Sequence, residues 1–430
     1  MNKYILLLTV IVLRTNMFAQ TPVPAQIQLQ PVLLKGGTAH IGNGQVIENA
    51  YIAFDKGIIT HIGTLPATIN EGGYRIIDAS GQHIYPGFIL PDTYLGLHEV
   101  ASIDAMNDTR EWGELNPNVR SLIAFNTDSK VLPTVRYNGI LIVESAPQGG
   151  AISGTSSVMN LDGWNWEDAA LKPDIGIHLH WPAKNSSQFD FASYSVKYEH
   201  NKDYSMLTNK LKQFFSDAIG YPKVKGDFRN LKLEAMQGLF SGEKILFVHA
   251  TGAECIIEAI TTFKGMNIKK IVLISGSETL EVAPFLAENN IPVIVPEVHG
   301  LPERSDMDVY LPFKIPALLT KAGVTVALSH RGDLASTRNL PFFAGTCAAW
   351  GLTSEQAIQL VTLNAAKILG VDHLVGTLEK GKQATLFISQ GDALDMLTNN
   401  LSYAFINGRQ LNLENEQQAL YLRYSEKYRK

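Results

Sequence analysis

Apolar residues along the chain follow two repeating patterns. Short apolar runs of about 4–8 residues bounded by Gly or Pro are typical of buried strands, and longer stretches with an apolar residue every three or four positions are typical of amphipathic helices. Between residues 139 and 369 the two patterns alternate. The short runs predict strands at Gly139–Ser145, Gly176–His180, Ile245–His249, Lys270–Ile274, Val293–Val295 and Val324–Ser329. The longer stretches predict helices at Asn201–Ala218, Gly252–Lys264, Thr279–Asn289, Leu311–Ala322 and Ser354–Leu369.

This alternation predicts a parallel sheet, and helices on one side of it only would close the sheet into an α/β barrel. The apolar run Pro86–Leu90 predicts a further strand ahead of the others, and Pro91 marks its end. In such barrels the C-terminal ends of the strands carry the catalytic groups. We therefore expect Asp92, Tyr94 and the loop residue His98 at the barrel mouth.

Ahead of the barrel the pattern changes to short alternating runs that are broken by glycine. Asn43-Gly44 and Asp55-Lys56-Gly57 supply the turn residues of two hairpins. We therefore expect a small antiparallel unit before residue 85. After Glu414 the spacing of Leu and Tyr among charged residues predicts an amphipathic helix.

The composition favours a folded protein with a large core. Of the 430 residues, 45% are hydrophobic and 18% are charged, which disfavours disorder. The net charge is −5 and the chain has no basic stripe, so nucleic acid is not an expected partner. Cys255 and Cys347 are too few for a disulfide scaffold. We expect buried free thiols, with a single long-range bridge as the alternative.

The N-terminus has the pattern of a signal peptide over residues 1–20. Lys3 provides a short basic region, the apolar stretch Tyr4–Leu13 is too short to span a bilayer, and small residues near Ala19 supply a cleavage site. The rest of the chain has no second apolar run of about 20 residues, so no membrane span is expected after signal cleavage. The segment predicts an exported protein, periplasmic or secreted.

Several stretches resemble landmarks of one enzyme family. Pro86-Gly87-Phe88-Ile89 resembles the first barrel strand of the amidohydrolase superfamily, whose pattern there is P-G-[FLI]-I-D-x-H-x-H. The stretches Val375–Ile388 and Thr362–Gly370 resemble the family patterns G-x-[IL]-x-x-G-K-x-A-D-[LF]-x and x-T-x-N-x-A-x-x-L-G. Within the superfamily, the chain is most similar to the imidazolonepropionase-like branch.

The resemblance implies an α/β fold in which a (β/α)8 TIM-like barrel is inserted in a small composite β-sandwich formed by both chain ends. The sandwich would comprise residues 31–84 plus 375–412, and the barrel would comprise residues 85–374. Residues 413–430 would form a separate C-terminal helix.

The resemblance also implies a divalent metal, typically zinc, at the barrel mouth. The family's ligands are a His-x-His on strand 1, a His on each of strands 5 and 6, and an Asp on strand 8; binuclear members add a Lys or Glu on strand 4. Of these, His249 matches at the end of strand 5. Asp92 and Tyr94 replace the strand 1 pair, so the metal site is predicted to be degenerate. Asp92 is a candidate oxygen ligand; the alternative, which we favour from the sequence, is that strand 1 binds no metal.

The remaining family positions also depart from the pattern. Ser275 stands where strand 6 should carry its His and is a candidate pocket residue, as is His330 after strand 8. After strand 8, His330 stands in the slot of the expected Asp, and Asp333 follows three residues later. Asp333 and His249 are the candidate catalytic residues. Asp333 would be the base that activates water; the alternative is that Asp333 only caps a loop.

Two further features at strand ends are candidates without a family counterpart. His178 and His180 alternate along one strand, which places both imidazoles on one face. This pair could replace the lost strand 1 ligands; the alternative is a structural pair bonded to backbone. His299 follows strand 7 and is a candidate pocket residue. The Gly-rich run Gln148–Ser157 is expected to be a loop at the barrel mouth.

Two functional hypotheses follow from the resemblance. The first is a hydrolase that acts on carbon–nitrogen bonds, non-peptide and of the cyclic amide type, in a small molecule, with one divalent metal such as zinc. The second is a catalytically inactive amidohydrolase fold without metal. Such a protein would bind a small ligand in the old pocket or pair, in a homo- or hetero-oligomer, with an active homologue.

Overall fold

The computed structural model describes residues 23–64, 69–100, 103–190, 194–221, 229–302, 306–331 and 334–429. The predicted signal peptide, residues 1–20, lies outside the described residues, and so does the candidate base Asp333. Within the described part of the chain, no helix combines the length and the apolar character that a bilayer crossing requires.

The larger unit is a barrel of eight strands, as predicted. The strands lie in the order β15-β14-β13-β12-β9-β8-β7-β6, and all but β8 run in the same direction. The edge strands β6 and β15 contact each other, and the hydroxyl of Ser329 after β15 donates to the Pro91 carbonyl at 2.6 Å. The sheet therefore nearly closes. The strands are β6 (Phe88–Thr93), β7 (Ile140–Ser145), β8 (Ile152–Asn160), β9 (Ala170–His180), β12 (Ile245–His249), β13 (Ile271–Ile274), β14 (Val293–Val295) and β15 (Val326–Leu328).

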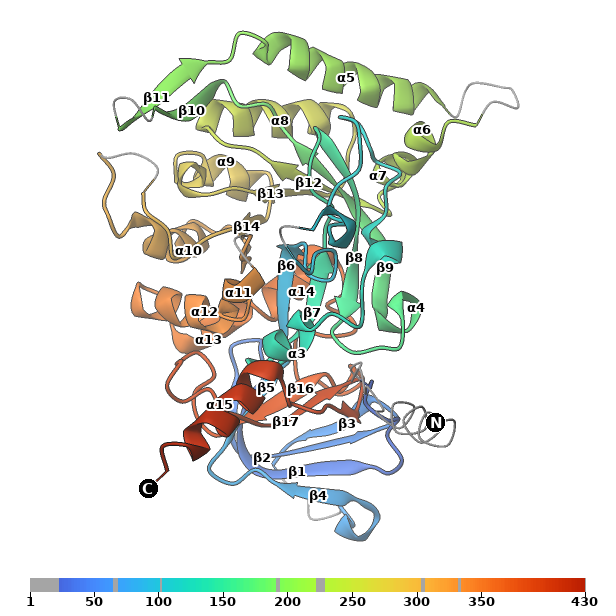
Figure 1. Cartoon of the computed structure of the whole chain (residues 1–430), viewed down its shortest axis with the longest axis vertical. Helices are drawn as coiled ribbons and strands as arrows, with labels where there is room; N and C mark the ends of the chain where they lie inside the picture. The colour runs from blue at the N-terminus through green and yellow to red at the C-terminus, as the bar shows by residue number, and fades with distance from the viewer. Residues whose placement is uncertain are drawn as a thin grey trace, which may run out of the picture.

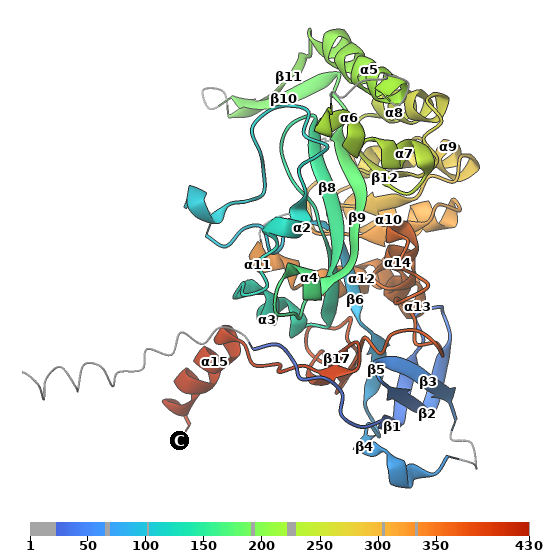
Figure 2. The same ribbon diagram turned by 90° about the vertical axis from the view of Figure 1, so that its right-hand side faces the viewer.

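The prediction of a loop over the Gly-rich run Gln148–Ser157 was wrong for most of its length. Residues from Ile152 onward form β8, which pairs antiparallel with both β7 and β9; Figure 2 shows β8 and β9 side by side. Only a short loop joins β7 to β8, and a short connection permits a hairpin rather than a parallel crossover. The strand is buried along its whole length, and a Cβ on Gly154 would lie 2.7 Å from the Val119 carbonyl. The small residues therefore reflect crowding.

The second unit is a sheet built from both ends of the chain. Its strands lie in the order β18-β17-β16-β5-β1-β2-β3, with β4 beside β1, and they gather at one end of the molecule in blue and red (Figure 1). Leu34 and Phe54 from the first half pack in one core with Leu386 and Phe405 from the second. The strands are β1 (Val32–His40), β2 (Val46–Asp55), β3 (Ile58–Gly63), β4 (Arg75–Asp78), β5 (His83–Pro86), β16 (Leu386–Ser389), β17 (Leu401–Ile406) and β18 (Arg409–Gln410).

Helices cover the outside of the barrel in both views (Figures 1 and 2). The five helices predicted between residues 201 and 369 are present, although two of them are divided into shorter segments: Thr279–Asn289 begins with a 3-10 turn before α9, and Ser354–Leu369 is split between α13 and α14. The sixth, predicted at the C-terminus, is α15. The hairpin of β10 (Asn185–Asp190) and β11 (Ser195–His200) was not predicted. The helices are α2 (Ser121–Ala124), α3 (Val131–Arg136), α4 (Trp166–Ala169), α5 (Tyr204–Gly220), α6 (Leu231–Ala235), α7 (Gln237–Ser241), α8 (Ala253–Gly265), α9 (Ala283–Glu288), α10 (Leu311–Lys321), α11 (Leu334–Thr337), α12 (Leu340–Ala349), α13 (Ser354–Leu360), α14 (Leu363–Leu369) and α15 (Glu416–Glu426).

The barrel interior is an apolar layer below the mouth. Ile89, Ile142, Phe247 and Ala327 meet there from four strands and are fully buried. Cys255 and Cys347 are buried free thiols, as expected, in the packing between the barrel and its helices. Polar groups at the C-terminal strand ends therefore stand on an apolar floor, where charge is poorly solvated.

Candidate metal centre

Four polar side chains converge at the C-terminal ends of neighbouring barrel strands. Asp92 comes from β6, Glu144 from β7, His178 from β9 and His249 from β12. The first three are fully buried, and His249 is 7% exposed. Each belongs to a strand that is otherwise mostly apolar at this end, so burial of the strand carries the polar group inside. The His178 ring also stacks on Phe247 of the barrel floor, with ring centres 4.5 Å apart.

Asp92, His178 and His249, the ligand cluster, present three donor atoms to one point. His178 Nδ1 lies 3.0 Å from His249 Nε2, and Asp92 Oδ1 lies 3.7 Å and 3.9 Å from these two nitrogens. Zinc bonds of about 2.0–2.1 Å place the ligands of a tetrahedral ion about 3.3 Å apart. Both carboxylate oxygens of Asp92 are buried without a hydrogen-bond partner. The spacing, the donor types and a carboxylate without a hydrogen bond all fit a divalent metal.

Backbone geometry directs Asp92 into the cluster. Its φ of 48° is left-handed, a conformation that Asp adopts more readily than most residues. Its backbone N–H donates to Glu144 Oε2 at 2.9 Å, and its carbonyl accepts from the Ser329 hydroxyl at 3.2 Å. These two bonds from neighbouring strands hold the turned backbone, which leaves Asp92 Oδ1 within 3.9 Å of both imidazoles.

Glu144 orients His178 and was not singled out from the sequence. Its Oε1 accepts a hydrogen bond from His178 Nε2 at 2.9 Å and another from the Ser156 hydroxyl at 2.7 Å. A carboxylate that holds the outer nitrogen of a histidine is the usual support of a metal-binding imidazole. The available signal was a single acidic residue inside the apolar strand Ile140–Ser145, since a buried carboxylate requires partners.

Arg331 contributes a cation that the sequence reasoning also missed. Its Nη1 donates to His249 Nδ1 at 3.0 Å, its Nη2 donates to Gln148 Oε1 at 2.9 Å, and its Nε lies 3.4 Å from Asp92 Oδ2. Three residues beyond β15, it reaches back over the cluster from the last strand. No local pattern marks this arginine, because its partners lie on other strands.

Burial dominates the electrostatics of the site. It raises the pKa of Asp92 to about 6, even though Arg331 and His178 pull that pKa down. Burial also lowers the pKa of His249 well below its ordinary value, and nearby His180, Arg331 and His178 lower that pKa further. Both effects favour the uncharged forms, because a low dielectric penalises the charged form of each group. A neutral imidazole is the form that binds a metal.

The predicted pair His178 and His180 is divided in the structure. His180 lies beside the ligand cluster and stacks on His249, with ring centres 4.2 Å apart, but it contributes no donor atom. Burial, assisted by Arg331 and His178, lowers the pKa of His180 to about 3. His178 is the member of the pair that meets Asp92 and His249.

The other predicted pocket residues lie at three places. Ser275 lines a cavity beside the cluster, and its hydroxyl is buried without a hydrogen-bond partner. Tyr94 and His98 contact each other after β6, with ring centres 5.7 Å apart. His299 pairs with the Thr346 hydroxyl of α12 at 2.7 Å, and His330 packs on Phe343 of the same helix. The structure therefore brings Ser275 toward the cluster and places His299 and His330 against α12.

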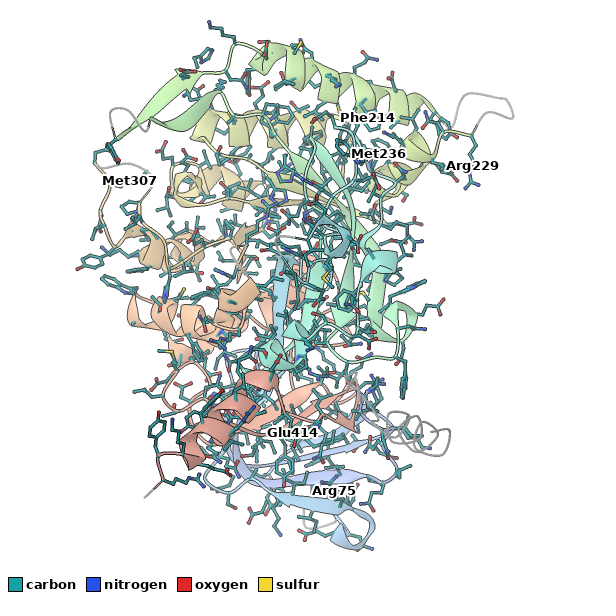
Figure 3. All side chains as sticks on the ribbon, in the orientation of Figure 1. Arg75, Phe214, Arg229, Met236, Met307 and Glu414 are labelled. Atoms are coloured by element: carbon teal, nitrogen blue, oxygen red, sulfur yellow. The ribbon has the colours of Figure 1, made fainter. Side chains whose placement is uncertain are left out.

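A cavity of about 440 Å³ opens beside the cluster. His249, His180 and Arg331 form its polar end, together with Ser275 and Ser277 at the end of β13. Apolar residues from the segments after β14 and in α10 supply much of the opposite wall: Pro296, Leu301, Met307, Leu311 and Ile315. Met307 is labelled in Figure 3 on the segment between β14 and α10. The size is that of a small-molecule site.

Comparisons with known proteins agree with the fold. The profile of the amidohydrolase family matches residues 313–411. The imidazolonepropionase of Geobacillus kaustophilus (strain HTA426) is 42% identical over 385 residues, which covers 80% of this chain and 84% of that protein. The imidazolonepropionase of Clostridium tetani (strain Massachusetts / E88) is 23% identical over 398 residues, 84% of this chain and 88% of that protein.

A solved structure gives the same result for the fold. An amidohydrolase from Thermotoga maritima MSB8 superposes with a TM-score of 0.76 at 21% sequence identity, and the match covers 89% of this chain and 99% of that one. Members of this family typically bind a divalent metal at the barrel mouth, where Asp92, His178 and His249 meet. The chain belongs to the amidohydrolase superfamily, in its imidazolonepropionase-like branch.

Proposed function

We propose that this protein is a metal-dependent hydrolase that acts on a carbon–nitrogen bond of a small cyclic amide-type molecule. The observation that carries the proposal is the ligand cluster: two imidazole nitrogens and a buried carboxylate oxygen without a hydrogen bond lie 3.0 to 3.9 Å apart. Similarity over most of the chain to proteins named imidazolonepropionase supports the reaction class. The cavity beside the cluster has the dimensions of a small substrate site.

Asp92, His178 and His249 would hold one zinc ion. Two His and one carboxylate make up a typical catalytic set that leaves a position open. A zinc ion bound there lowers the pKa of a water molecule and polarises a carbonyl group. Glu144 Oε1 accepts a hydrogen bond from His178 Nε2–H, which holds the ring proton there and leaves Nδ1 free for a metal. The apolar floor lies below the site. Asp333 remains our candidate for the base that takes a proton from water.

A second candidate is a catalytically inactive member of the fold. One observation favours it: Arg331 donates to His249 Nδ1, so a fixed cation already lies at the cluster. In that case the cavity would bind a small ligand without hydrolysis, or the protein would act beside an active homologue.

Metal content separates the two candidates. The mature protein, purified without chelators or a His tag and then loaded with excess zinc and desalted, is measured by elemental mass spectrometry. We expect about one equivalent of zinc, lost in His178→Ala, and hydrolysis within a panel of cyclic amides and dipeptides. A folded wild-type protein that retains no zinc after loading would contradict the hydrolase proposal and leave the inactive candidate.

A further inference from the structure

Arg331 contacts two of the three residues of the ligand cluster. Its guanidinium donates to His249 Nδ1 and lies 3.4 Å from an Asp92 oxygen. A third bond, to Gln148 Oε1 at 2.9 Å, anchors the group from the loop between β7 and β8. These contacts place a positive charge against the carboxylate that the metal would use. The arginine therefore affects both the electrostatics of the site and the hydrogen bonding of His249, a candidate metal ligand.

While Arg331 donates to His249, the hydrogen bonds of His249 leave no lone pair for a metal. A guanidinium has only donors, so His249 Nδ1 must accept with its lone pair. The ring proton then sits on Nε2, which donates to His178 Nδ1 at 3.0 Å, and His178 Nε2–H donates to Glu144. Each group therefore donates to the next, from Arg331 through His249 and His178 to Glu144. A metal would need the lone pairs of His249 Nε2 and His178 Nδ1, and both are engaged in the bond between them.

The structure leaves a route by which Arg331 can leave the cluster. Its side chain is 26% exposed and borders the cavity of about 440 Å³, whereas Asp92 and His178 are fully buried and do not line that cavity. From the cavity, the cluster is reached past His249 and Arg331. Glu297, an exposed carboxylate on the same cavity wall, offers a partner for a displaced guanidinium.

We propose that Arg331 is an internal cation that competes with the metal for the ligand cluster, so that the site holds either the guanidinium or the metal ion, one at a time. The inference rests on the proposed function, because it takes the ligand cluster as the metal site. Metal entry then requires two changes at once. The Arg331 side chain withdraws from His249 and Asp92, and the His249 proton moves from Nε2 to Nδ1. Zinc affinity in the wild type is consequently set in part by how firmly Arg331 is held.

Zinc affinity of the full mature chain tests the competition. A chromophoric chelator competes for zinc with the wild type, with Arg331→Met, which keeps the length of the side chain and removes the charge, and with Arg120→Met. The last variant removes an arginine from a surface ion pair with Asp174 and is the matched control. We expect Arg331→Met to bind zinc about 10-fold or more tightly than the wild type, since changes around metal ligands shift affinity by about 10–100-fold. The control should match the wild type.

A second variant keeps the test decisive if Arg331→Met folds poorly, and thermal melting adds a second readout if it folds well. Gln148→Ala removes only the anchor of Arg331, and we expect it to bind zinc more tightly than the wild type by a smaller factor. Without metal, Arg331→Met should melt at a lower temperature than the wild type, because buried Asp92 loses its cationic neighbour, and added zinc should raise its Tm more than that of the wild type.

The outcomes distinguish this inference from the proposed function. Tight zinc binding by the wild type, with Arg331→Met and Gln148→Ala no tighter, would overturn the competition and leave the metal site in place. An absence of zinc binding in all variants would overturn the metal site itself. Zinc binding by Arg331→Met that survives a second change, His178→Ala, would place the metal elsewhere and overturn both.

Discussion

At the scale of single residues, His178 and His180 show how two equivalent positions acquire different roles. They lie two residues apart on β9 and face the same side. His178 is fixed by Glu144 on one nitrogen and meets His249 with the other, whereas His180 stacks flat on His249 and its Nε2 is buried without a hydrogen-bond partner. Glu144 decides the difference, because its carboxylate hydrogen-bonds to the more deeply buried ring, His178.

This division gives a prediction for two matched substitutions. His178→Phe should weaken zinc binding by more than about 100-fold, because it removes a ligand, while His180→Phe should leave the affinity about unchanged, because a ring still stacks on His249. Chelator competition measures both. Equal losses in the two variants would show that His180 is also a ligand.

At the scale of elements, the position of His178 depends on close contact between β9 and β12. Gly176 of β9 lies against the partner strand, and a Cβ there would come within 2.5 Å of the Phe247 ring and 2.7 Å of the Ile245 carbonyl. Since His178 follows two residues later, the spacing of these strands also sets where its ring sits relative to His249. The glycine is required by the close approach of backbone and ring, not by a turn.

We therefore expect Gly176→Ala to lower the free energy of unfolding by about 1–3 kcal/mol through overpacking and to weaken zinc binding. Gly265→Ala, at the end of α8, is the control: a Cβ there meets nothing within 4 Å, so the change should stabilise by up to about 1 kcal/mol. Urea titrations give both values. An unchanged midpoint in Gly176→Ala would mean that the strands separate without cost.

At the scale of the whole molecule, Asp162 ties three distant parts of the chain together. It follows β8 and is almost fully buried. Its carboxylate accepts from Arg136 of α3 at 3.0 Å, lies 3.5 Å from Arg409 of β18, and accepts from the backbone N–H of Ala25 at 3.2 Å. The barrel, the composite sheet and the segment before β1 therefore share one buried charge.

Removal of that charge should destabilise the protein strongly. Asp162→Ala leaves buried Arg136 without its ion-pair partner and leaves Arg409 with only Asp168 at 3.6 Å, and breaking a buried pair costs about 3–5 kcal/mol. Glu234→Ala, which breaks the exposed pair with Arg229, should cost at most about 1 kcal/mol. Denaturant unfolding of the three proteins compares them. Similar midpoints for the two variants would show that the Asp162 cluster is no more important than a surface pair.

The sequence by itself was sufficient for the order and type of most elements. The strands and helices between residues 139 and 369 follow from periodicity, which is a local property: each apolar run reports the burial of its own segment. The nearly closed barrel with a sheet from both chain ends followed from resemblance as well as from pattern. Asp92 and His249 could be identified because each ends an apolar strand.

Tertiary structure alone decided the rest, because the deciding contacts join residues that are distant in the chain. The direction of β8 depends on which neighbours its short loops allow, and its glycine and serine content suggested a loop instead. Glu144 and Arg331 act only through Asp92, His178 and His249, which come from other strands. Whether the cluster holds an arginine or a metal is set by donors and acceptors that meet only when the sheet closes.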